Sequence, residues 1–372
     1  MSVIRVDTDR GFQALAKDWN QVLERSYSPE IFRTWEWQYA WWQTFGGAYE
    51  LRIFAVQRGA EIVAVAPLYV RSVALLGLRR VNVVRLIADD VIGSDFLDWL
   101  VPQEEESVLA NELLEGMLAY FDGNVIFDFR DVAADSVVAR RVLPGLTERG
   151  FLSRQIFRYL CPYLELPSSF EQFMRNLGSS TREGLRRKTR KLEKNHQVRL
   201  LLGGDQVAAE DALRVLWELH ERRWQGRGED SCQRPGFKSF HDRVLTLLRP
   251  NVLLYLLQVD GRSVAAQYNF SFLDRVYQYQ SGFDPEAAAL SPGTVLMVKV
   301  LEDSIARGAT RFELLRGDES YKGRFTRANR ATFKIVATKS RAFLSAYTFS
   351  DTLRQTKRSA LKVAGTLAGI LR

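Results

Sequence analysis

The chain contains few of the residues that build disulfide frameworks and metal sites. Among its 372 residues are two cysteines, Cys161 and Cys232, and three histidines. Two cysteines are too few for a disulfide framework, and no two histidines stand at the spacing of metal ligands. We therefore expect no bound metal, and two buried or idle thiols in a reducing compartment.

Several localisation and catalytic signals are absent as well. The N-terminal stretch MSVIRVDTDRGF has no apolar core of signal-peptide length, and no apolar run is long enough to cross a bilayer. The sequence has neither the Gly-x-Ser-x-Gly elbow of serine hydrolases nor a Walker phosphate-binding loop. These absences predict a cytoplasmic protein outside both of those enzyme classes.

The composition that remains is that of a folded, basic α/β protein. Hydrophobic residues make up 46% and charged residues 26%, which is ordinary for a globular chain. The net charge of +8 favours an anionic partner, such as a nucleotide cofactor, a nucleic acid or an anionic lipid, without choosing among them. The length suggests two domains, and alternating strand and helix patterns predict an α/β architecture with mixed sheets.

An internal repeat supports two similar domains. The stretch Leu51–Leu68 aligns with Leu253–Phe270 when Gly59 is matched to Gly261, an offset of 202 residues. A second pair, GNVIFDFRD from residue 123 and GATRFELLR from residue 308, repeats at an offset of 185 residues. A repeat near half the chain length predicts two related domains rather than a solenoid.

The most informative stretch runs from Val276 to Arg324. Its pattern predicts a strand over Val276–Phe283, a helix that begins at Ser291-Pro292-Gly293 and ends at Gly308, and a second strand over Thr310–Leu315. Further on, the pattern predicts closing strands over Ala331–Ala337 and Ala342–Tyr347.

This strand, loop and helix predict an anion site next to two acids. Free backbone N–H groups and the helix dipole favour a phosphate or pyrophosphate at Ser291, Gly293 and Thr294. The second strand delivers Asp318 and Glu319 to the same sheet edge, where a carboxylate can accept a proton. The alternatives are an ordinary strand–helix–strand unit and, for the acids, a salt bridge to a neighbouring basic residue.

These residues resemble a known family. The SPG loop and the ending LLRGDESYKGRF are similar to the CelD-like acetyltransferases of the GNAT superfamily, and the resemblance extends from Val3 to Tyr347. It implies a doubled GNAT fold shared with Fem-type transferases, with acyl-CoA as co-substrate. Because only the second copy of the repeat has the SPG loop and the polar Gln267 and Tyr268, we expect a supporting domain at 1–167 and a catalytic domain at 168–350. The loop AALSPGT departs from the family pattern, because it lacks the arginine or glutamine that binds pyrophosphate.

For the reaction that the resemblance implies, the residues themselves suggest individual roles. Asp318 or Glu319 takes the proton of an attacking amine or hydroxyl, and Tyr321, Tyr279 or Tyr268 donates a proton to the leaving thiolate. Gln267 and Gln280 hydrogen-bond the acceptor, and Lys322 balances the acids or binds substrate. The acceptor implied is a sugar or polysaccharide precursor in cellulose or exopolysaccharide biosynthesis.

Two basic segments complete the candidate site. The sequence TREGLRRKTRKLEKN, from Thr181, predicts a helix with an excess of cations, and the resemblance places an anionic ligand near Arg187, Lys188 and Arg190. A nucleic-acid arm and a solvated helix face are the alternatives. Residues 351–372 predict a basic amphipathic helix, which suits peripheral membrane contact or docking on the protein itself.

Two rival functions follow from the same residues. One is a Fem-type aminoacyl or peptidyl transferase that uses charged tRNA, in which the basic helix would contact phosphates. The other is a non-catalytic scaffold that kept the fold, which the atypical pyrophosphate loop allows. A steep salt dependence of nucleic-acid binding would favour the first rival, and failure to bind any acyl-CoA would favour the second.

Overall fold

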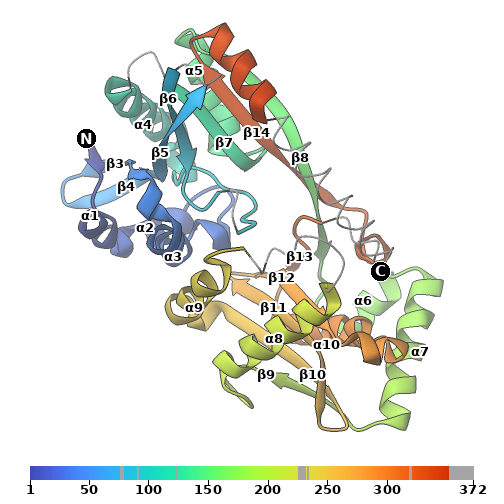
Figure 1. The fold of residues 1–372 in the computed structure, drawn as a ribbon. Coiled ribbons are helices and arrows are strands. Elements are labelled where there is room, and N and C mark those ends of the chain that lie inside the picture. Colours follow the sequence, from blue (N-terminus) through green and yellow to red (C-terminus); the bar gives the residue numbers. More distant parts are fainter. Residues whose placement is uncertain are drawn as a thin grey trace. The chain divides into compact units, whose positions relative to one another are not determined.

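The chain folds into two units, each built around a sheet. The computed structural model describes residues 1–75, 79–89, 92–121, 125–224, 232, 234–317 and 321–351 (Figure 1). Unit 1 comprises Met1–Tyr159 together with the described segment that starts at Ala331, and unit 2 comprises Leu160–Arg330. The segment 331–351 therefore groups with unit 1, whereas the sequence analysis placed it in the C-terminal domain. Of the helix predicted over 351–372, only Asp351 lies within the described residues.

Unit 1 contains a three-stranded sheet and a larger mixed sheet. The small sheet has the order β1-β3-β4, and in the larger sheet the neighbours run β2-β5-β6-β7-β14-β8. The strands are β1 Ser2–Val6, β2 Glu50–Leu51, β3 Ile53–Arg58, β4 Glu61–Ala66, β5 Leu68–Leu75, β6 Arg79–Leu86, β7 Val125–Ala133, β8 Leu152–Glu165 and β14 Asn329–Thr338. The α-helices named for this unit are α1 Asp9–Ala14, α2 Ala16–Glu24, α3 Trp35–Phe45, α4 Glu106–Tyr120 and α5 Leu143–Glu148.

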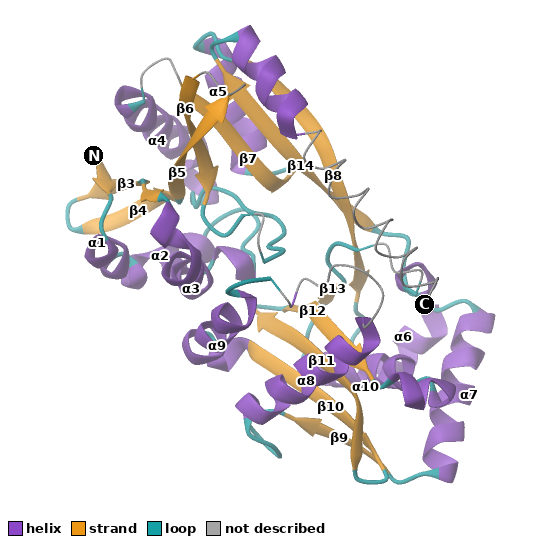
Figure 2. Cartoon of the chain, viewed as in Figure 1, coloured by secondary structure: helices purple, strands orange, loops and turns teal. Residues whose placement is uncertain are grey.

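Unit 2 is a sheet with helices on both faces (Figure 2). The strand neighbours run β8-β13-β12-β11-β10-β9. The new strands are β9 Val198–Leu202, β10 Val252–Val259, β11 Arg262–Phe272, β12 Arg275–Phe283 and β13 Arg311–Glu313. The helices are α6 Phe170–Asn176, α7 Ser179–Asn195, α8 Ala209–Trp224, α9 Phe237–Leu247 and α10 Pro292–Ala306, with short 3-10 turns η7 Pro285–Leu290 and η8 Lys322–Arg324.

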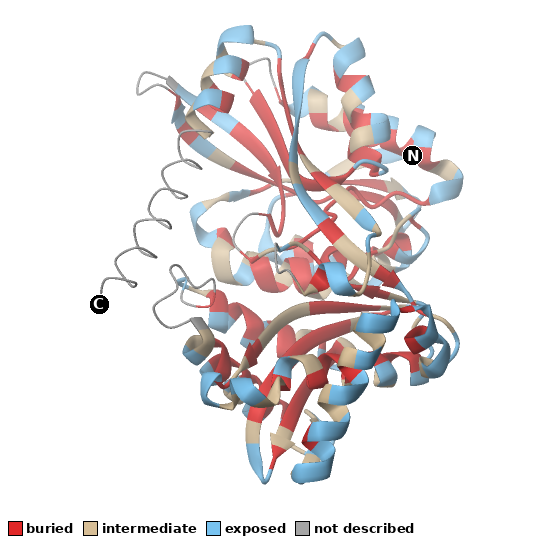
Figure 3. Cartoon of the chain, turned by 90° about the vertical axis from the view of Figure 1, so that its right-hand side faces the viewer, coloured by how far each residue is buried: buried red, intermediate tan, exposed pale blue. Residues whose placement is uncertain are grey.

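Alternating side chains of β10 show that different helices cover the two faces of this sheet. Tyr255, Leu257 and Val259 belong to a core cluster with α6, α7 and α10, whereas Leu254 and Leu256 do not. Successive side chains of a strand point to opposite faces, so the second set faces α8, which contacts the same strand. Figure 3 shows that buried residues follow the strands within each unit.

The repeated hairpins are present, and their register corrects the sequence alignment. The hairpin β3–β4 turns at Gly59-Ala60, between the paired residues Arg58 and Glu61. The hairpin β10–β11 turns at Asp260-Gly261, between Val259 and Arg262, and both hairpins carry a bulge at the same distance from the turn. The structural offset is therefore 201 residues, the difference between 259 and 58. Gly59 corresponds to Asp260, because the glycine is first in one turn and second in the other.

Each unit also contains one pair of parallel strands followed by an antiparallel neighbour. In unit 1, β6 pairs with β7 over three residues and β14 lies antiparallel beyond β7. In unit 2, β12 pairs with β13 over three residues and β8 lies antiparallel beyond β13. The antiparallel strand beside the parallel pair thus comes from late in the chain in unit 1 and from the first half of the chain in unit 2. This exchange is why 331–351 groups with unit 1.

One predicted strand is a helix. Residues 341–351 are helical, whereas the alternation in Ala342–Tyr347 predicted a strand. Ser340 begins the helix, because its side-chain oxygen accepts a hydrogen bond from the Phe343 backbone N–H at 3.2 Å. Leu344 and Tyr347 are three residues apart and both buried, which is helical spacing.

Candidate active site

The two parallel strands of unit 2 diverge where the candidate site begins. Their register covers Arg275–Tyr277 on β12 and Arg311–Glu313 on β13. Strand β12 then continues to Phe283, while β13 ends and the chain turns at Leu315, whose φ is 56°. Over Gln278–Phe283, β12 therefore continues beyond its pairing with β13.

Buried amides lie beside this part of β12 on one face of the sheet. Gln267 and Asn269 of β11 are 2% and 0% exposed, and the Asn269 side-chain N–H₂ donates to Gln267 Oε1 at 3.3 Å. Gln278, which pairs with Asn269 in register, accepts a hydrogen bond from Tyr321 Oη at 3.3 Å. The sequence analysis missed Asn269 and Gln278, although Asn269 stands two residues after Gln267 and therefore shares its face.

Aromatic residues occupy the opposite face. The ring of Tyr268 lies 5.4 Å from His241 and 5.9 Å from Tyr279, and Gln280 pairs with Tyr268 in register. Burial raises the pKa of the Tyr268 hydroxyl well above its usual value, and Asp242 adds to the shift. Burial also lowers the pKa of His241 to about 3, so this imidazole is neutral at pH 7. The residues predicted to bind the substrate therefore lie on two different faces of the sheet, with Gln267 on one face and Tyr268 on the other.

The sequence predicts an anion site at the start of α10, and the structure describes the local backbone there. Ser291 stands at the N-cap position in a left-handed conformation (φ 54°), and its side chain makes no capping hydrogen bond. Pro292 occupies the first helical position as predicted, and the Thr294 N–H donates to the Ser291 carbonyl at 3.0 Å. A Cβ on Gly293 would meet Phe283 at 3.8 Å, an ordinary contact, so the glycine is not required for folding.

A cation reaches this region from another helix. Arg223 in the last turn of α8 donates to Ser281 Oγ at 3.3 Å, and its guanidinium lies 5.1 Å from the centre of the Phe283 ring. Phe283 is the side chain that contacts the position of Gly293. The loop between β12 and α10 contains no arginine, so Arg223 supplies positive charge that the local sequence does not show.

The residues after β13 are described in part. Asp318 and Glu319 lie outside the described residues. Lys322 is 4% exposed, and its Nζ donates to the carbonyls of Leu315 at 3.2 Å and Arg316 at 2.9 Å. Lys322 therefore holds the turn that follows β13. In the sequence, this turn directly precedes Asp318 and Glu319.

Helix α7 presents its cations to solvent. It buries Leu185 and Leu192 in the core cluster with α10, and Glu193 receives an ion pair from Lys299 of α10 at 2.6 Å. Arg187 and Arg190 are exposed and Lys188 is half-buried. Across the described ranges, no ion pair involves any of the cations Arg186, Arg187, Lys188, Arg190, Lys191 and Lys194.

Two searches of the described residues bear on metals and membranes. In that part of the chain, no group of three or more histidine, cysteine or acidic residues is arranged to hold a metal ion. None of the helices there is both long and apolar enough to span a bilayer.

One stretch of unit 2 is similar to acyltransferase domains of the GNAT type. Residues 179–323 match the family model described as an acetyltransferase (GNAT) domain, and this range contains the diverging strands and α10. No curated protein matches the chain. The family match and the fold together support an acyltransferase.

Solved structures resemble the whole chain in fold. FemX is 11% identical with a TM-score of 0.60, covering 90% of this chain and 97% of FemX. The C-terminal domain of a putative lysylphosphatidylglycerol synthetase from Agrobacterium fabrum is 11% identical with a TM-score of 0.55, covering 92% and 96%. L-PGS from Bacillus licheniformis is 13% identical with a TM-score of 0.51, covering 92% and 96%. At these identities the likeness shows the fold alone.

Proposed function

We propose that unit 2 transfers an acyl group, in the first instance acetyl, from acyl-CoA to an amine or hydroxyl of a sugar or polysaccharide precursor. The observation that carries the proposal is the divergence of β12 from β13 beside the uncapped start of α10, inside residues 179–323. The resemblance of the SPG loop and its ending to CelD-like acetyltransferases supports the acceptor class.

The donor would lie along the part of β12 that extends beyond its pairing with β13. The backbone N–H of Gly293 at the start of α10 binds the pyrophosphate, with the side chains of Ser291 and Thr294 beside it. Arg223 compensates for the missing arginine of the loop, because its guanidinium is held beside Phe283. Arg187, Lys188 and Arg190 of α7, which packs against α10, add positive charge for the remaining phosphate.

The transfer step needs one base and one proton donor. Asp318 accepts the proton of the acceptor nitrogen or oxygen as that atom bonds to the thioester carbonyl carbon, and Glu319 is the alternative base. Backbone N–H groups at the edge of β12 stabilise the negative charge on the carbonyl oxygen. The carbon–sulfur bond then breaks, and Tyr321, which is hydrogen-bonded to Gln278, donates a proton to the departing thiolate. Gln280 and Tyr279 shape the acceptor side on the face of the sheet that also carries Tyr268, whereas Gln267 supports β12 from the opposite face.

The base assignment is tested by a pair of conservative substitutions. We predict that Asp318→Asn lowers turnover by about two orders of magnitude or more, because the amide cannot accept the proton. Acetyl-CoA binding should be unchanged, and Glu319→Gln should lower turnover less. The measurement is release of the CoA thiol from acetyl-CoA with a panel of amino sugars. Near-normal turnover by Asp318→Asn would show that the assignment is wrong.

A Fem-type transferase that uses charged tRNA is the second candidate. It is favoured by the cations of α7, for which the described residues offer no ion pair, and the chain shares the fold of FemX. Binding of tRNA that weakens steeply with salt, together with no acetyl-CoA binding, would favour this candidate. Acetyl-CoA binding with little affinity for tRNA would favour the first.

A further inference from the structure

A groove lies between helices α8 and α9 of unit 2, on the face of the sheet opposite to α10 (Figure 1). Six residues of α8, from Glu210 to Glu221, and four of α9, from Lys238 to Thr246, line it. These residues recur at helical spacing, so one stripe of each helix faces the groove. Its volume of about 560 Å³ is enough for a small organic molecule. None of the described residues assigned to acyl transfer lines it.

Trp217 forms the floor of this groove and leaves one donor without a partner. It lines the groove but is only 6% exposed, because its ring packs against those of Phe237, His241 and Tyr268. Within the described chain, the indole N–H of Trp217 makes no hydrogen bond, and its nitrogen is not among the fully buried atoms that lack a partner. A buried tryptophan usually finds an acceptor for this N–H. The donor is therefore available to an acceptor atom of a molecule in the groove.

The rim of the groove is charged, with four carboxylates and two cations among the lining residues. Both cations are already paired, Arg214 with Glu218 at 3.1 Å and Lys238 with Glu221 at 2.5 Å. The Asp242 carboxylate, one turn after Lys238, accepts no hydrogen bond and joins no ion pair within the described residues. Burial raises the pKa of Asp242 although Lys238 opposes the shift, so the carboxylate has lost part of its hydration.

The charge around the groove favours a cationic ligand. Two residues beside the lining take part in its ion pairs, because Arg249 lies 3.0 Å from Glu210 and Asp211 lies 3.1 Å from Arg214. With these two included, five carboxylates stand against three cations. An anionic ligand would add to this excess of negative charge, whereas an ammonium beside Asp242 would reduce it.

We propose that this groove binds an organic ammonium that also carries hydroxyl groups, as an amino sugar does. The ammonium pairs with the Asp242 carboxylate, which has no counter-charge of its own within the described residues. A hydroxyl oxygen of the same ligand accepts a hydrogen bond from the Trp217 N–H, and the apolar face of the ligand ring covers the indole. The proposal concerns binding alone and does not rest on acyl transfer in unit 2.

Binding is tested with glucosamine as the probe, in its protonated form and without acyl-CoA, by ligand-observed NMR titration of the full chain. We expect Asp242→Asn to bind glucosamine about tenfold more weakly than the wild type, or worse, because the ammonium loses its partner. Trp217→Phe should weaken binding less, since it keeps the aromatic floor and removes the N–H donor. The control is Glu302→Gln, which removes another carboxylate without an ion pair from α10 on the opposite face of the sheet and should bind like the wild type.

Two further probes separate the parts of the ligand. N-acetylglucosamine lacks the ammonium and cyclohexylamine lacks the hydroxyl groups, and each should bind about tenfold more weakly than glucosamine. Equal binding of either probe would overturn the ligand assignment.

The remaining outcomes also decide the proposal. No glucosamine binding by the wild type would overturn it, and so would equal binding by Asp242→Asn, because the sugar would then bind elsewhere on the chain. If Trp217→Phe does not fold, the exposed Asp242→Asn variant and the two further probes still decide. Because no titration contains acyl-CoA, a failure of acyl transfer leaves these results unchanged.

Discussion

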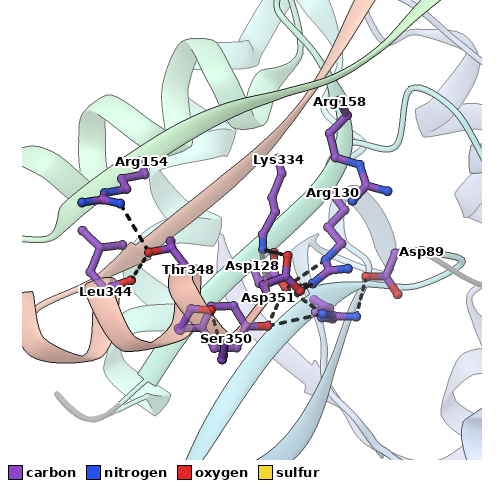
Figure 4. Close-up of polar contacts among 12 residues, drawn as sticks. Asp89, Asp128, Arg130, Arg154, Arg158, Lys334, Leu344, Thr348, Ser350 and Asp351 are labelled. Atoms are coloured by element: carbon purple, nitrogen blue, oxygen red, sulfur yellow. Dashed lines mark hydrogen bonds and ion pairs between the residues drawn. The ribbon is translucent and has the colours of Figure 1, made fainter. Parts of the chain in front are cut away.

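Asp128 shows how one buried carboxylate depends on its neighbours (Figure 4). Burial alone would raise the pKa of its carboxyl, but Arg130, Arg85 and Lys334 outweigh burial and hold the pKa well below the usual value. A carboxyl whose pKa is lower in the folded state stabilises the fold at pH above its unfolded pKa of about 4. That stability is lost as the pH falls through the lowered folded pKa. Asp351, whose pKa is lowered by Arg130 and Lys334 against the effect of burial, acts in the same direction.

Replacing Asp128 should therefore have a pH-dependent effect on stability. We predict that Asp128→Asn lowers the free energy of unfolding by about 3–5 kcal/mol at pH 7, because three buried cations lose their shared partner. The difference from the wild type should shrink as the pH falls below about 4, because the Asp128 carboxyl then takes up a proton in the unfolded chain before it does so in the folded protein. Urea unfolding followed by circular dichroism between pH 3 and 7 measures it. A difference that is the same at every pH would contradict the account.

Single site residues were predictable only where the strand pattern was regular. The sequence placed Gln267 on a strand, and strand alternation alone would have added Asn269 on the same face. The bulge at Tyr279 was not readable, because it depends on pairing between β11 and β12. The contribution of Arg223 was also hidden, since it comes from a helix that ends more than fifty residues before Ser281. The assignment of Asp318 or Glu319 as the base stays a prediction from the sequence.

At the scale of elements, Gly282 sets the distance between β12 and α8. A Cβ at this position would lie 2.5 Å from the His220 backbone nitrogen and 2.8 Å from the Leu219 carbonyl carbon. Backbone atoms of a packed helix cannot move aside as a side-chain end can. The close approach also positions the His220 ring, whose Nδ1 lies 3.0 Å from the Ser281 carbonyl.

This contact predicts opposite effects of the same substitution at two glycines. Gly282→Ala should destabilise the protein by about 1–3 kcal/mol, because α8 must shift away from the sheet. Gly184→Ala in α7 is the control, since its Cβ would meet nothing within 4 Å and alanine favours a helix by up to about 1 kcal/mol. Urea unfolding of both variants measures the effects. A stable Gly282→Ala variant would contradict the observed packing.

Two elements were predicted wrongly because a local sequence pattern fitted two different structures. The hairpin alignment followed the two glycines, but a two-residue turn accepts glycine at either position, so the offset was wrong by one residue. The helix 341–351 was predicted as a strand because alternation and helical spacing coincide over six residues. The helix that follows the SPG loop was predicted correctly, since proline at its first position and an apolar stripe agree.

At the scale of the whole molecule, the sequence did not predict which strands lie beside β7 and β13. Strand β14 pairs with β7, and β8 pairs with β13, across separations of about 150 to 200 residues. Local patterns carry no information about such pairings. The α/β class and the strand–helix–strand order of the site were predictable, because both depend on periodicity and capping within short windows. For function, the consequence is that the candidate site on β12 and α10 belongs to unit 2, whereas the buried charged residues around Asp128 belong to unit 1.

The central claim, that unit 2 binds acyl-CoA at the start of α10, is tested most directly by titrating acetyl-CoA in a calorimeter. The wild type should bind, and Gly293→Val should bind about tenfold more weakly or worse, because its side chain crowds the pyrophosphate. Its melting temperature should stay near that of the wild type, since Gly293 has room for a Cβ. Gly47→Val, at an open exposed position in unit 1, should bind like the wild type. No binding by the wild type, or equal binding by Gly293→Val, would contradict the account.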